Sequence, residues 1–422
     1  MIKSLLRYYW KQARHFDAIL VAAVVLLTIG GILMIYSASV WQALAGNKPP
    51  TYYLERQLIA LVPALIASLI LSVFPLHILR RFAWLGYLLA CVLVLTVPIF
   101  GRHIFGATRW FSVGGFTFQP SEIAKLAVVL VLATWFSQQP DRARSFRSGL
   151  LFALIIIVIP AGLVELEPDL GTSLVVAAGG LGVLFAAGLA KRYLVGVIPL
   201  VFVVVFVLAN SASYRVHRLE AFTNPLSTKN STSVTYQVVQ GLIALGSGGI
   251  TGEGIGSGIQ KFNYLPQPAT DSIFAVIGEE LGFVGAMSTL LIFAALGWRG
   301  YMVARNADSQ FGGILAYGVT TSIISQAVLN IASTTSALPF TGVPLPFISY
   351  GGSSLVMSFV AAGLLLNISA HPALPVAPTV TAKETPPPPP VSHLKEILES
   401  HNRSTPRHHS RSRRPVRAVR TR

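Results

Sequence analysis

The amino-acid sequence predicts an all-α polytopic membrane protein with ten transmembrane helices and a large extracellular loop between spans 7 and 8. The chain has 422 residues, of which 53% are hydrophobic and only 11% are charged, whereas a soluble globular domain carries roughly 25% charged residues. The mean hydropathy is +0.63. Apolar stretches of about 18 residues or more, the length that crosses a bilayer as a helix, recur between Asp17 and Ala370. A soluble protein with a large core is the weaker alternative.

The ten predicted spans follow the apolar stretches in order along the chain. They cover approximately residues 17–39, 57–76, 82–100, 120–137, 149–165, 170–190, 193–210, 271–297, 309–335 and 345–369. Lys and Arg gather in both terminal segments and in the short connections on one side of these spans. Because positive residues are enriched on the cytoplasmic side of a membrane, we expect both termini to be cytoplasmic.

Composition along the chain predicts three regions. These are a cytoplasmic N-terminal segment (residues 1–16), a ten-span membrane domain (17–370) and a disordered, Pro-rich, basic cytoplasmic tail (371–422). The tail contains TPPPPPV and RHHSRSRRPVRAVRTR, and from residue 372 it carries ten Lys and Arg against three Glu. A polyproline run stays extended, and a dense basic run cannot bury a core. We expect the tail to contact anionic lipid, with docking of a protein partner as the alternative.

The distribution of charge and the residue types present argue against several functions. The net charge is +16, but outside the tail most of it lies in short loops between spans, which indicates membrane topology rather than nucleic-acid binding. The single cysteine, Cys91, allows no disulfide and no cysteine metal site within one chain. The sequence has no HExxH or CxxC motif and no histidine cluster, so a zinc enzyme is not expected.

Three acids fall on or in one predicted membrane helix, in the segment QPATDSIFAVIGEELG (267–282). Asp271 is expected in the first turn, at the outer water layer, where backbone N–H groups favour negative charge. It is either part of an N-terminal cap, a role that Thr270 can also fill, or a residue of an outer-face site. Glu279 and Glu280 lie two turns deeper and point about 100° apart. We assign both to packing or cavity polarity.

A second charged group lies in QPSEIAK (119–125). Glu122 and Lys125 are i,i+3 neighbours on a predicted helix and can form an ion pair. Intramembrane charges commonly line a functional cavity, and a purely structural pair is the alternative.

A set of cations falls on the predicted outer side, against the usual charge bias: Arg56, Arg109, Arg215, Arg218 and Lys261. The planar fork of arginine and the point charge of lysine suit a phosphate group, so the set fits an anionic lipid head group. Lipid contact or a surface ion pair is the alternative for each one. Trp110, beside Arg109, is either an interfacial anchor or a member of the same site.

Six motifs occur in order between about Asp17 and Ala370. They are YYLERQ, GATRWFSVGGFTFQPSEIAKLA, LEPDLGTSLV, YQVVQGLIALGSGGITGEGIG, NYLPQPATDSIFAVIGEELGFVG and LPFTGVPLPFISYGGSS. Together they resemble the SEDS (shape, elongation, division, sporulation) family of bacterial cell-wall polymerases, and IGEELGF and the last motif look most like its division branch. Proteins of this family have ten spans with both ends cytoplasmic, in agreement with the count above.

The resemblance implies a peptidoglycan glycosyltransferase in the bacterial cytoplasmic membrane, acting at the division septum. Such proteins polymerise lipid II, a disaccharide-pentapeptide on undecaprenyl diphosphate, outside the membrane. They work with a class B penicillin-binding protein and other division proteins. The competing interpretations are a lipid II flippase and a non-catalytic scaffold that activates a partner synthase.

The family's functional residues map onto individual positions of this chain. Its essential aspartate matches Asp271, which is expected to act as general base in an inverting displacement of the lipid diphosphate. The other matching positions are Arg56, Arg109, Trp110, Glu122 and Lys125. Arg215, Arg218 and Lys261 are further candidates for holding the diphosphate, and a Mg²⁺ ion shared by Asp271 and the diphosphate is a possible cofactor.

Two positions depart from the family pattern. Ala269 stands where the family commonly has His, two residues before Asp271, and Glu167 stands where Gln is more usual. The first departure puts any role of that His in doubt but leaves the aspartate in place.

Overall fold

The computed structural model describes residues 15–104, 107–113, 116–190, 192–193, 195–197, 199, 203, 207, 213–223 and 233–371. All of them belong to one compact unit, Met1–Ala373. The first 14 residues, most of the predicted seventh span (193–210) and the tail after His371 lie outside the described residues.

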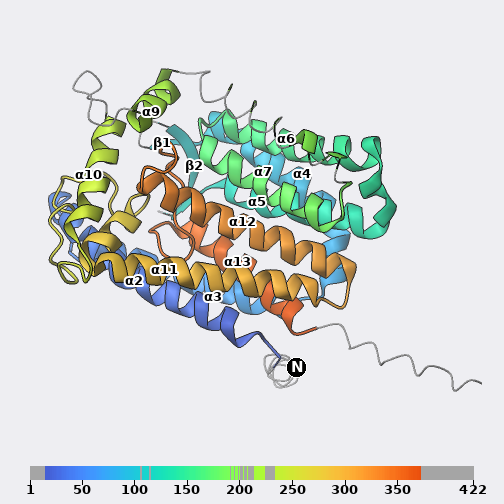
Figure 1. Cartoon of the computed structure of the whole chain (residues 1–422), viewed down its shortest axis with the longest axis horizontal. Helices are drawn as coiled ribbons and strands as arrows, with labels where there is room; N and C mark the ends of the chain where they lie inside the picture. The colour runs from blue at the N-terminus through green and yellow to red at the C-terminus, as the bar shows by residue number, and fades with distance from the viewer. Residues whose placement is uncertain are drawn as a thin grey trace, which may run out of the picture. The chain divides into compact units, whose positions relative to one another are not determined.

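The described unit is built mainly from long α-helices that run back and forth along one another (Figure 1). They are α2 (Ala18–Ala45), α3 (Tyr52–Leu71), α4 (Leu76–Phe100), α5 (Pro120–Gln138), α6 (Phe152–Glu165), α7 (Leu170–Ala186), α11 (Ile273–Arg305), α12 (Gln310–Thr334) and α13 (Gly352–Ser369). A short 3-10 helix, η1 (Pro140–Arg144), and a π-helical turn, η2 (Phe146–Leu151), precede α6, and two shorter helices, α9 (Ser213–Thr223) and α10 (Ser233–Ser247), precede α11.

Within the described ranges, eight helical segments are long and apolar enough to cross a membrane, with η2 and α6 counted as one segment. The shorter apolar helix α7 covers the predicted sixth span. The structure therefore confirms an all-α, multi-pass membrane protein. The count of ten stays a prediction, because the seventh span lies mostly outside the described residues.

Several span boundaries differ from the prediction by five residues or more, among them the end of α2 (Ala45 against 39), the start of α4 (Leu76 against 82) and the end of α11 (Arg305 against 297). The starts of α3 and α13 have a local cause. α3 begins at Tyr52 rather than at residue 57, because its first turn is polar and Thr51 donates a hydrogen bond to the Glu55 side chain at 2.6 Å. A hydropathy window sees only the apolar remainder of that helix. α13 begins at Gly352 rather than at residue 345, since the preceding apolar residues fold into a turn in which the Ser349 N–H donates to the Leu345 carbonyl at 3.0 Å.

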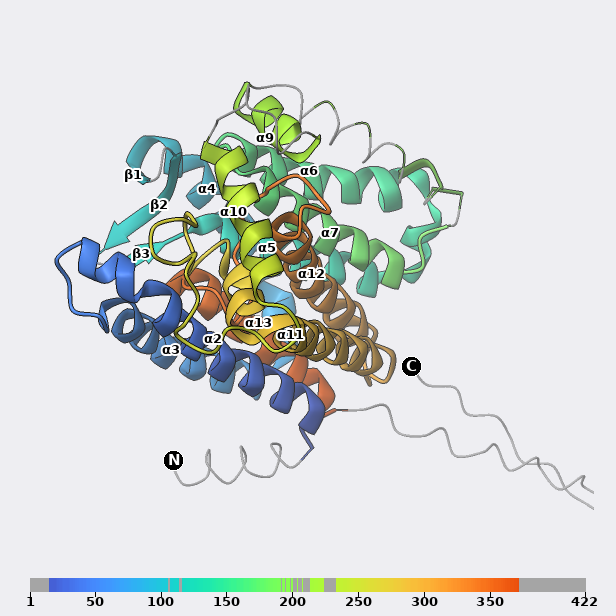
Figure 2. The ribbon, with the colours of Figure 1, turned by 60° about the vertical axis from the view of Figure 1, so that its left-hand side comes forward.

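Helix α12 lies at the centre of the unit and packs against α5, α7, α11 and α13, while α13 also packs against α3 (Figures 1 and 2). Small residues permit these close contacts. A Cβ atom added to Gly182 of α7 would lie 2.6 Å from Thr321 Oγ1 of α12. Close helix approach through small residues is typical of membrane proteins, where van der Waals packing drives association.

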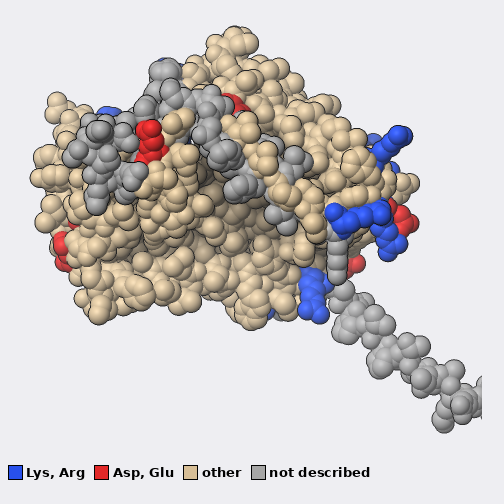
Figure 3. Space-filling view, turned by 45° about the horizontal axis from the view of Figure 1, so that its top comes forward, with Lys and Arg blue, Asp and Glu red and all other residues tan. Residues whose placement is uncertain are grey.

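The outer surface of the helices is strongly apolar. Ile66, Leu88 and Leu291 are each more than half exposed, and on the face in Figure 3 Lys, Arg, Asp and Glu appear only in a few separate places of the described part. Exposed apolar belts of this kind fit a lipid environment.

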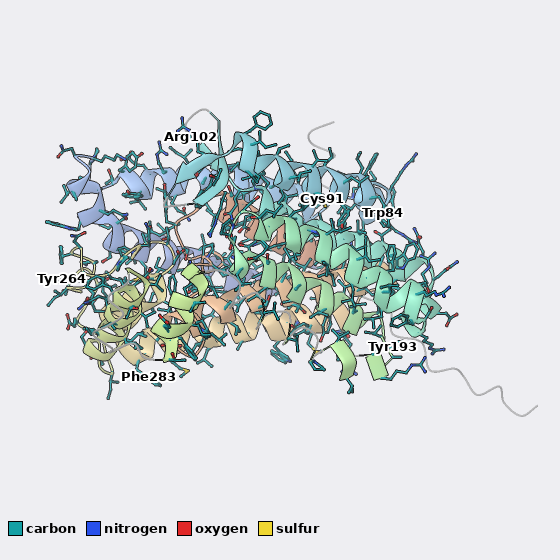
Figure 4. The ribbon with its side chains drawn as sticks, turned by 90° about the horizontal axis from the view of Figure 1, so that it is seen from above. Trp84, Cys91, Arg102, Tyr193, Tyr264 and Phe283 are labelled. Carbon is teal, nitrogen blue, oxygen red and sulfur yellow. The ribbon has the colours of Figure 1, made fainter. Side chains whose placement is uncertain are left out.

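One end of the bundle, here called the site end, carries the longer connections. There α3, α5, α7, α11 and α13 begin, and α2, α4, α6 and α12 end. Figure 4 shows Tyr264 and Phe283 toward this end and Trp84 and Tyr193 toward the other.

The site end also holds a small antiparallel sheet, which the sequence did not predict. Its strands are β1 (Arg102–Ile104), β2 (Ala107–Val113) and β3 (Phe116–Phe118), in the order β1-β2-β3. Arg102 pairs with Trp110, and Phe111 pairs with Phe118. The sheet connects α4 to α5 and presents Arg109 from its central strand.

Candidate active site

The backbone that carries Asp271 is held at three successive carbonyls by donors from two other parts of the chain. The Tyr350 N–H donates to the Ala269 carbonyl at 2.8 Å. The Ser349 hydroxyl donates to the Thr270 carbonyl at 2.6 Å. Both donors come from the 335–351 connection, which is therefore fixed to the segment that leads into α11.

The next carbonyl, that of Asp271 itself, is held from α12. Asn330 is 1% exposed, and its Nδ2 atom donates to the Asp271 carbonyl at 3.0 Å and to the Val343 carbonyl at 2.7 Å. One residue further on, Gln237 of α10 donates to the Ser272 hydroxyl at 2.9 Å. Asp271 thus stands on a backbone that other elements hold in place immediately before α11.

The carboxylate of Asp271 itself is left accessible. The residue is partly exposed, and within the described part of the chain its carboxylate accepts no hydrogen bond. Gly342, with φ of 73°, faces it, so that a Cβ there would lie 3.4 Å from Asp271 Oδ2. Desolvation by burial raises the pKa of Asp271 to about 7, with Asp169 raising it further and Arg109 and Arg218 opposing the rise.

Arg109 links the sheet to the turn between α6 and α7. Its Nε donates to the Glu167 carbonyl at 2.9 Å, and its Nη2 donates to the Pro168 carbonyl. Its Nη1 lies 3.7 Å from Asp169 Oδ2. The two hydrogen bonds use two of the five N–H groups of the guanidinium, and the positive charge remains close enough to act on Asp271.

Asp169 caps α7 and is well supplied with donors. Its carboxylate accepts from the Thr172 N–H at 3.1 Å, the Thr172 hydroxyl at 2.9 Å and Gln119 Nε2 at 3.2 Å. An ionised carboxylate at a helix N-terminus is stabilised by such donors and by the helix dipole. The Asp169 carboxylate is therefore held in a fixed position beside Arg109.

Glu167, two residues before Asp169 in the same connection, has the opposite environment. It is 1% exposed, and neither of its carboxyl oxygens has a hydrogen-bond partner among the residues that the structure describes. Burial raises its pKa to about 8, the charge of Asp169 adds to the rise, and Arg109 opposes it. Glu167 is accordingly held as a neutral acid near pH 7.

Two further predicted cations lie around the same end of the bundle. Arg218 of α9 donates to the carbonyls of Phe340 and Thr341 at 3.2 and 3.4 Å, and its charge acts on Asp271. Arg56 is exposed on α3, with its guanidinium carbon 4.9 Å from the centroid of the Tyr52 ring. The side chain of Arg215 lies outside the described residues.

The Glu122–Lys125 pair is buried one level below this end. Lys125 Nζ lies 2.7 Å from Glu122 Oε2 and donates to Gln326 Oε1 at 2.6 Å, which confirms the predicted i,i+3 pair. The two residues line a cavity of about 30 Å³ together with Gln326 and Ser358. A cavity of this size holds a water molecule, so the pair borders a small polar space.

Lys261 is placed differently from the prediction. It is 6% exposed, and its ammonium lies 2.7 Å from Glu280 and 3.0 Å from the Ser37 hydroxyl. The structure therefore contradicts its assignment as a diphosphate ligand, because its charge and its hydrogen bonds are used inside the protein. Glu279 and Glu280 serve in packing, as predicted.

The residues near Asp271 do not build a resident metal site. In the described portion of the chain, no group of three or more His, Cys, Asp or Glu side chains is arranged to hold a metal ion. Mg²⁺ prefers an octahedral set of oxygens and often binds through one carboxylate and substrate phosphates. The Asp271 carboxylate fits that single-ligand role, in which a bound Mg²⁺ would neutralise charge on a diphosphate.

The fold and the site define a class of protein. The chain is a multi-pass α-helical membrane protein in which an accessible aspartate, two arginines and a buried acidic turn meet at one end of the bundle. Residues 17–373 match the FtsW/RodA/SpoVE family, described as "Cell cycle protein". The chain belongs to this family, as its motifs indicated.

Curated relatives cover nearly the same part of the chain. It is 38% identical over 360 residues to the probable peptidoglycan glycosyltransferase FtsW of Trichlorobacter lovleyi, a match that covers 84% of this chain and 93% of the relative. It is 37% identical over 359 residues to the stage V sporulation protein E of Bacillus subtilis, covering 84% of this chain and 97% of the relative.

Solved structures share the fold. A chain from a structure described as "Structural coordination of polymerization and crosslinking by a peptidoglycan synthase complex" superposes with a TM-score of 0.70 at 29% identity, covering 84% of this chain and 97% of the other. The rod shape determining protein RodA of Thermus thermophilus superposes with a TM-score of 0.62 at 28% identity, covering 84% and 96%.

Sequence reasoning left several residues of this site without a role. Asn330 and Gln326 stand in an otherwise apolar helix, and a polar residue inside a membrane span is a functional hypothesis by default, so that signal was available. Asp169 and Thr172 form a helix-cap pattern that could also have been read. Ser349 gave no local signal, because its partner is 79 residues away in the chain.

Proposed function

We propose that this protein is a peptidoglycan glycosyltransferase that polymerises lipid II into glycan strands on the outer face of the cytoplasmic membrane during cell division. The single observation that carries the proposal is the environment of Asp271. Its backbone is fixed by α12 and the 335–351 connection, and its partly exposed carboxylate has a pKa of about 7. The family and the names of the relatives supply the substrate class.

The proposed reaction is a displacement with inversion. The 4-hydroxyl oxygen of one lipid-linked sugar forms a bond to the anomeric carbon of another, and the bond from that carbon to the undecaprenyl diphosphate breaks. Asp271 accepts the hydroxyl proton, and the diphosphate leaves with the bonding electron pair. A general base is most effective when its pKa lies near the working pH, and a value of about 7 meets that condition.

Cations around Asp271 support the binding of the leaving diphosphate. Arg109 and Arg218 already act on Asp271 through their charge, and preorganised positive groups stabilise charge that grows in a transition state. Arg56, Arg215 and Trp110 are proposed to extend this surface, and Glu122 and Lys125 to line the polar space beneath it. Lys261 is not part of this proposal.

The cellular setting is proposed from the same family relation. Both termini would be cytoplasmic, the site end would face outward at the division septum, and a class B penicillin-binding protein would supply the cross-linking activity along with other division proteins. The three-region division at residues 1–16, 17–370 and 371–422, with a basic tail on anionic lipid, belongs to this proposal.

The test is polymerisation of purified lipid II by the full-length protein together with its class B penicillin-binding protein, analysed by gel separation of glycan strands. Asp271→Asn should lose at least about 100-fold in rate, the usual range for a general base being 10²–10⁴. The wild-type rate should rise with pH toward a plateau above about 7. A variant as fast as the wild type would overturn the role of Asp271.

The two competing functions appear as outcomes of the same experiment. Transport of lipid II across vesicle membranes with no glycan product would support a flippase. An Asp271→Asn variant that stimulates the partner synthase as strongly as wild type does would support a scaffold. The cavity beside Glu122 and Lys125, at about 30 Å³, has room for a water molecule but not for a disaccharide, so the structure gives the flippase no specific support.

A further inference from the structure

Helix α11 is interrupted at Gly282, where φ is 65° and ψ is −163°. An unbroken helix would pair the carbonyls of Glu279 and Glu280 with the N–H groups of Phe283 and Val284. The break separates these four groups and would leave them without partners inside the helix. The segment 273–281 is therefore a short half-helix, which begins two residues after Asp271.

The loop 248–265, here called the clamp loop, satisfies all four groups. The N–H groups of Glu253 and Gly254 donate to the carbonyls of Glu279 and Glu280, each at 3.0 Å. In the other direction, the N–H groups of Phe283 and Val284 donate to the carbonyls of Gly249 and Ile250 at 2.9 and 3.1 Å. At the break, these four backbone groups of α11 therefore form hydrogen bonds with the clamp loop instead of with one another.

Glycine is required on both sides of this exchange. A Cβ on Gly282 would lie 2.2 Å from the Gly252 nitrogen, and a Cβ on Gly252 would lie 2.2 Å from the Glu280 carbonyl oxygen. Both residues have positive φ, which only glycine adopts freely. The contact is therefore backbone against backbone and leaves no room for a side chain.

The two adjacent acids of the half-helix hold different parts of the same loop. Glu279 Oε1 accepts from the N–H groups of Ile259 and Gln260 at 2.7 and 3.0 Å. Glu280, with no exposed surface, pairs with Lys261 at 2.7 Å and accepts from the Gly256 N–H at 3.0 Å.

A third element joins through Ser37 of α2. Its hydroxyl lies 2.6 Å from Glu280 Oε1 and 3.0 Å from Lys261 Nζ. The ion pair thus connects the half-helix both to the clamp loop and to α2.

We infer that Glu279, Glu280 and Lys261 are positioning residues for Asp271, acting through the half-helix that they fasten to the clamp loop and α2. The inference rests on the proposed role of Asp271 as general base. Because the half-helix does not continue into the rest of α11 with regular hydrogen bonds, the clamp loop sets the position of the half-helix and acts together with the 335–351 connection and α12 on the position of Asp271. Errors of about 1 Å in such a position can cost about 100-fold in rate.

The test compares Lys261→Met, Ser37→Ala and the double variant Lys261→Met with Glu280→Gln, in the polymerisation assay described above. Lys261→Met should lower kcat by about tenfold to 100-fold, with KM changed less than about twofold, and should shift the pH at which the rate is half-maximal. That pH midpoint follows the pKa of Asp271, which depends on its distance from the charges of Arg109, Asp169 and Arg218. The double variant should recover part of the loss, because it leaves no unpaired buried charge.

Matched controls separate positioning from folding. Glu253→Gln changes an exposed side chain of the clamp loop and keeps the backbone N–H that donates to the Glu279 carbonyl, and it should leave kcat and the pH midpoint unchanged. Arg299→Met breaks the ion pair with Asp17 at the other end of the bundle, and it should reduce thermal stability without moving the pH midpoint. If Lys261→Met behaves like Arg299→Met, the inference is wrong.

A second measurement covers the case in which Lys261→Met does not fold. Ser37→Ala removes a single hydroxyl, and hydrogen exchange of the amides at residues 253, 254, 283 and 284 should become at least about tenfold faster in it than in wild type. Unchanged exchange together with an unchanged rate would refute the clamp. If Asp271→Asn is fully active while these amides respond as expected, the clamp stands and the proposed function fails.

Discussion

The ionised carboxyl of Asp271 lowers the free energy of unfolding, and a substitution that removes its charge should therefore stabilise the protein. Burial raises its pKa from an ordinary value of 3.8 to about 7. At about 1.4 kcal/mol per pH unit, ionising this carboxyl in the folded protein costs up to about 4 kcal/mol more than in the unfolded chain. A raised acid pKa means that the unfolded state binds fewer protons between those two values, so stability falls as pH rises from about 4 to about 7 and stays reduced above that.

The prediction is that Asp271→Asn is more stable than wild type while losing activity. Its advantage should approach about 4 kcal/mol at pH 8 as an upper limit, since the residue is partly exposed and solvent screens it. At pH 5 the advantage should shrink to about 1.5 kcal/mol, because wild-type Asp271 is then mostly protonated in the folded state.

The assay is thermal unfolding of both proteins in the same detergent at pH 5 and pH 8. Asp169→Asn is the matched control, because it removes the same charge from a carboxylate that accepts three side-chain and backbone hydrogen bonds. It should reduce stability by about 1.5–3 kcal/mol. The reasoning fails if Asp271→Asn has the same advantage at both pH values, or if it is less stable than wild type at pH 8.

Three further predictions concern the surrounding residues. Glu167→Gln should raise stability more above pH 8 than near pH 5, because a pKa raised from 4.5 to about 8 makes wild type lose stability as pH rises through that window; thermal unfolding at pH 5 and pH 9 checks this, and equal effects at both would contradict it. Arg109→Lys should lower the polymerisation rate by about tenfold or more, since lysine cannot reproduce the contacts to the Glu167 carbonyl and Asp169 together; a rate equal to wild type would show that the charge alone suffices. Lys125→Met should cost about 3–5 kcal/mol by leaving Glu122 buried and unpaired, and the double variant with Glu122→Leu should regain most of it in unfolding experiments; a double variant no better than the single would argue against the pair.

Much of the fold was available from the sequence because membrane spans follow from local composition. Bilayer thickness sets the length of an apolar helix, so the positions of α2, α5 and α12 were predicted to within a few residues at their starts. The starts of α3 and α13 were not predicted as closely. The polar first turn of α3 lowers the hydropathy of its start, and the apolar turn before α13 raises the hydropathy of residues that are not helical.

The site was predictable only in part. Asp271 and Arg109 were identified through motifs, and Glu122 with Lys125 through helical spacing. Lys261 was misassigned because its partner, Glu280, is buried on another element, and spacing along the chain gave no sign of that contact. The break at Gly282 was equally hidden, since glycine inside an apolar run is compatible with an unbroken helix and only the close approach of the clamp loop shows why it is there.

Four carboxylates of this region show how one chemical group is given different tasks by its donors. Asp169, Glu279 and Glu280 each accept hydrogen bonds from N–H groups, and such bonds fix the carboxylate in place. In these three residues the carboxylate oxygens hold the structure together. Asp271 is held instead through the backbone carbonyls on either side of it, so that its position is fixed while its oxygens stay free of donors in the described structure. We conclude that this separation of positioning from hydrogen bonding is what leaves the oxygens of Asp271, rather than those of its better-bonded neighbours, open to a substrate hydroxyl.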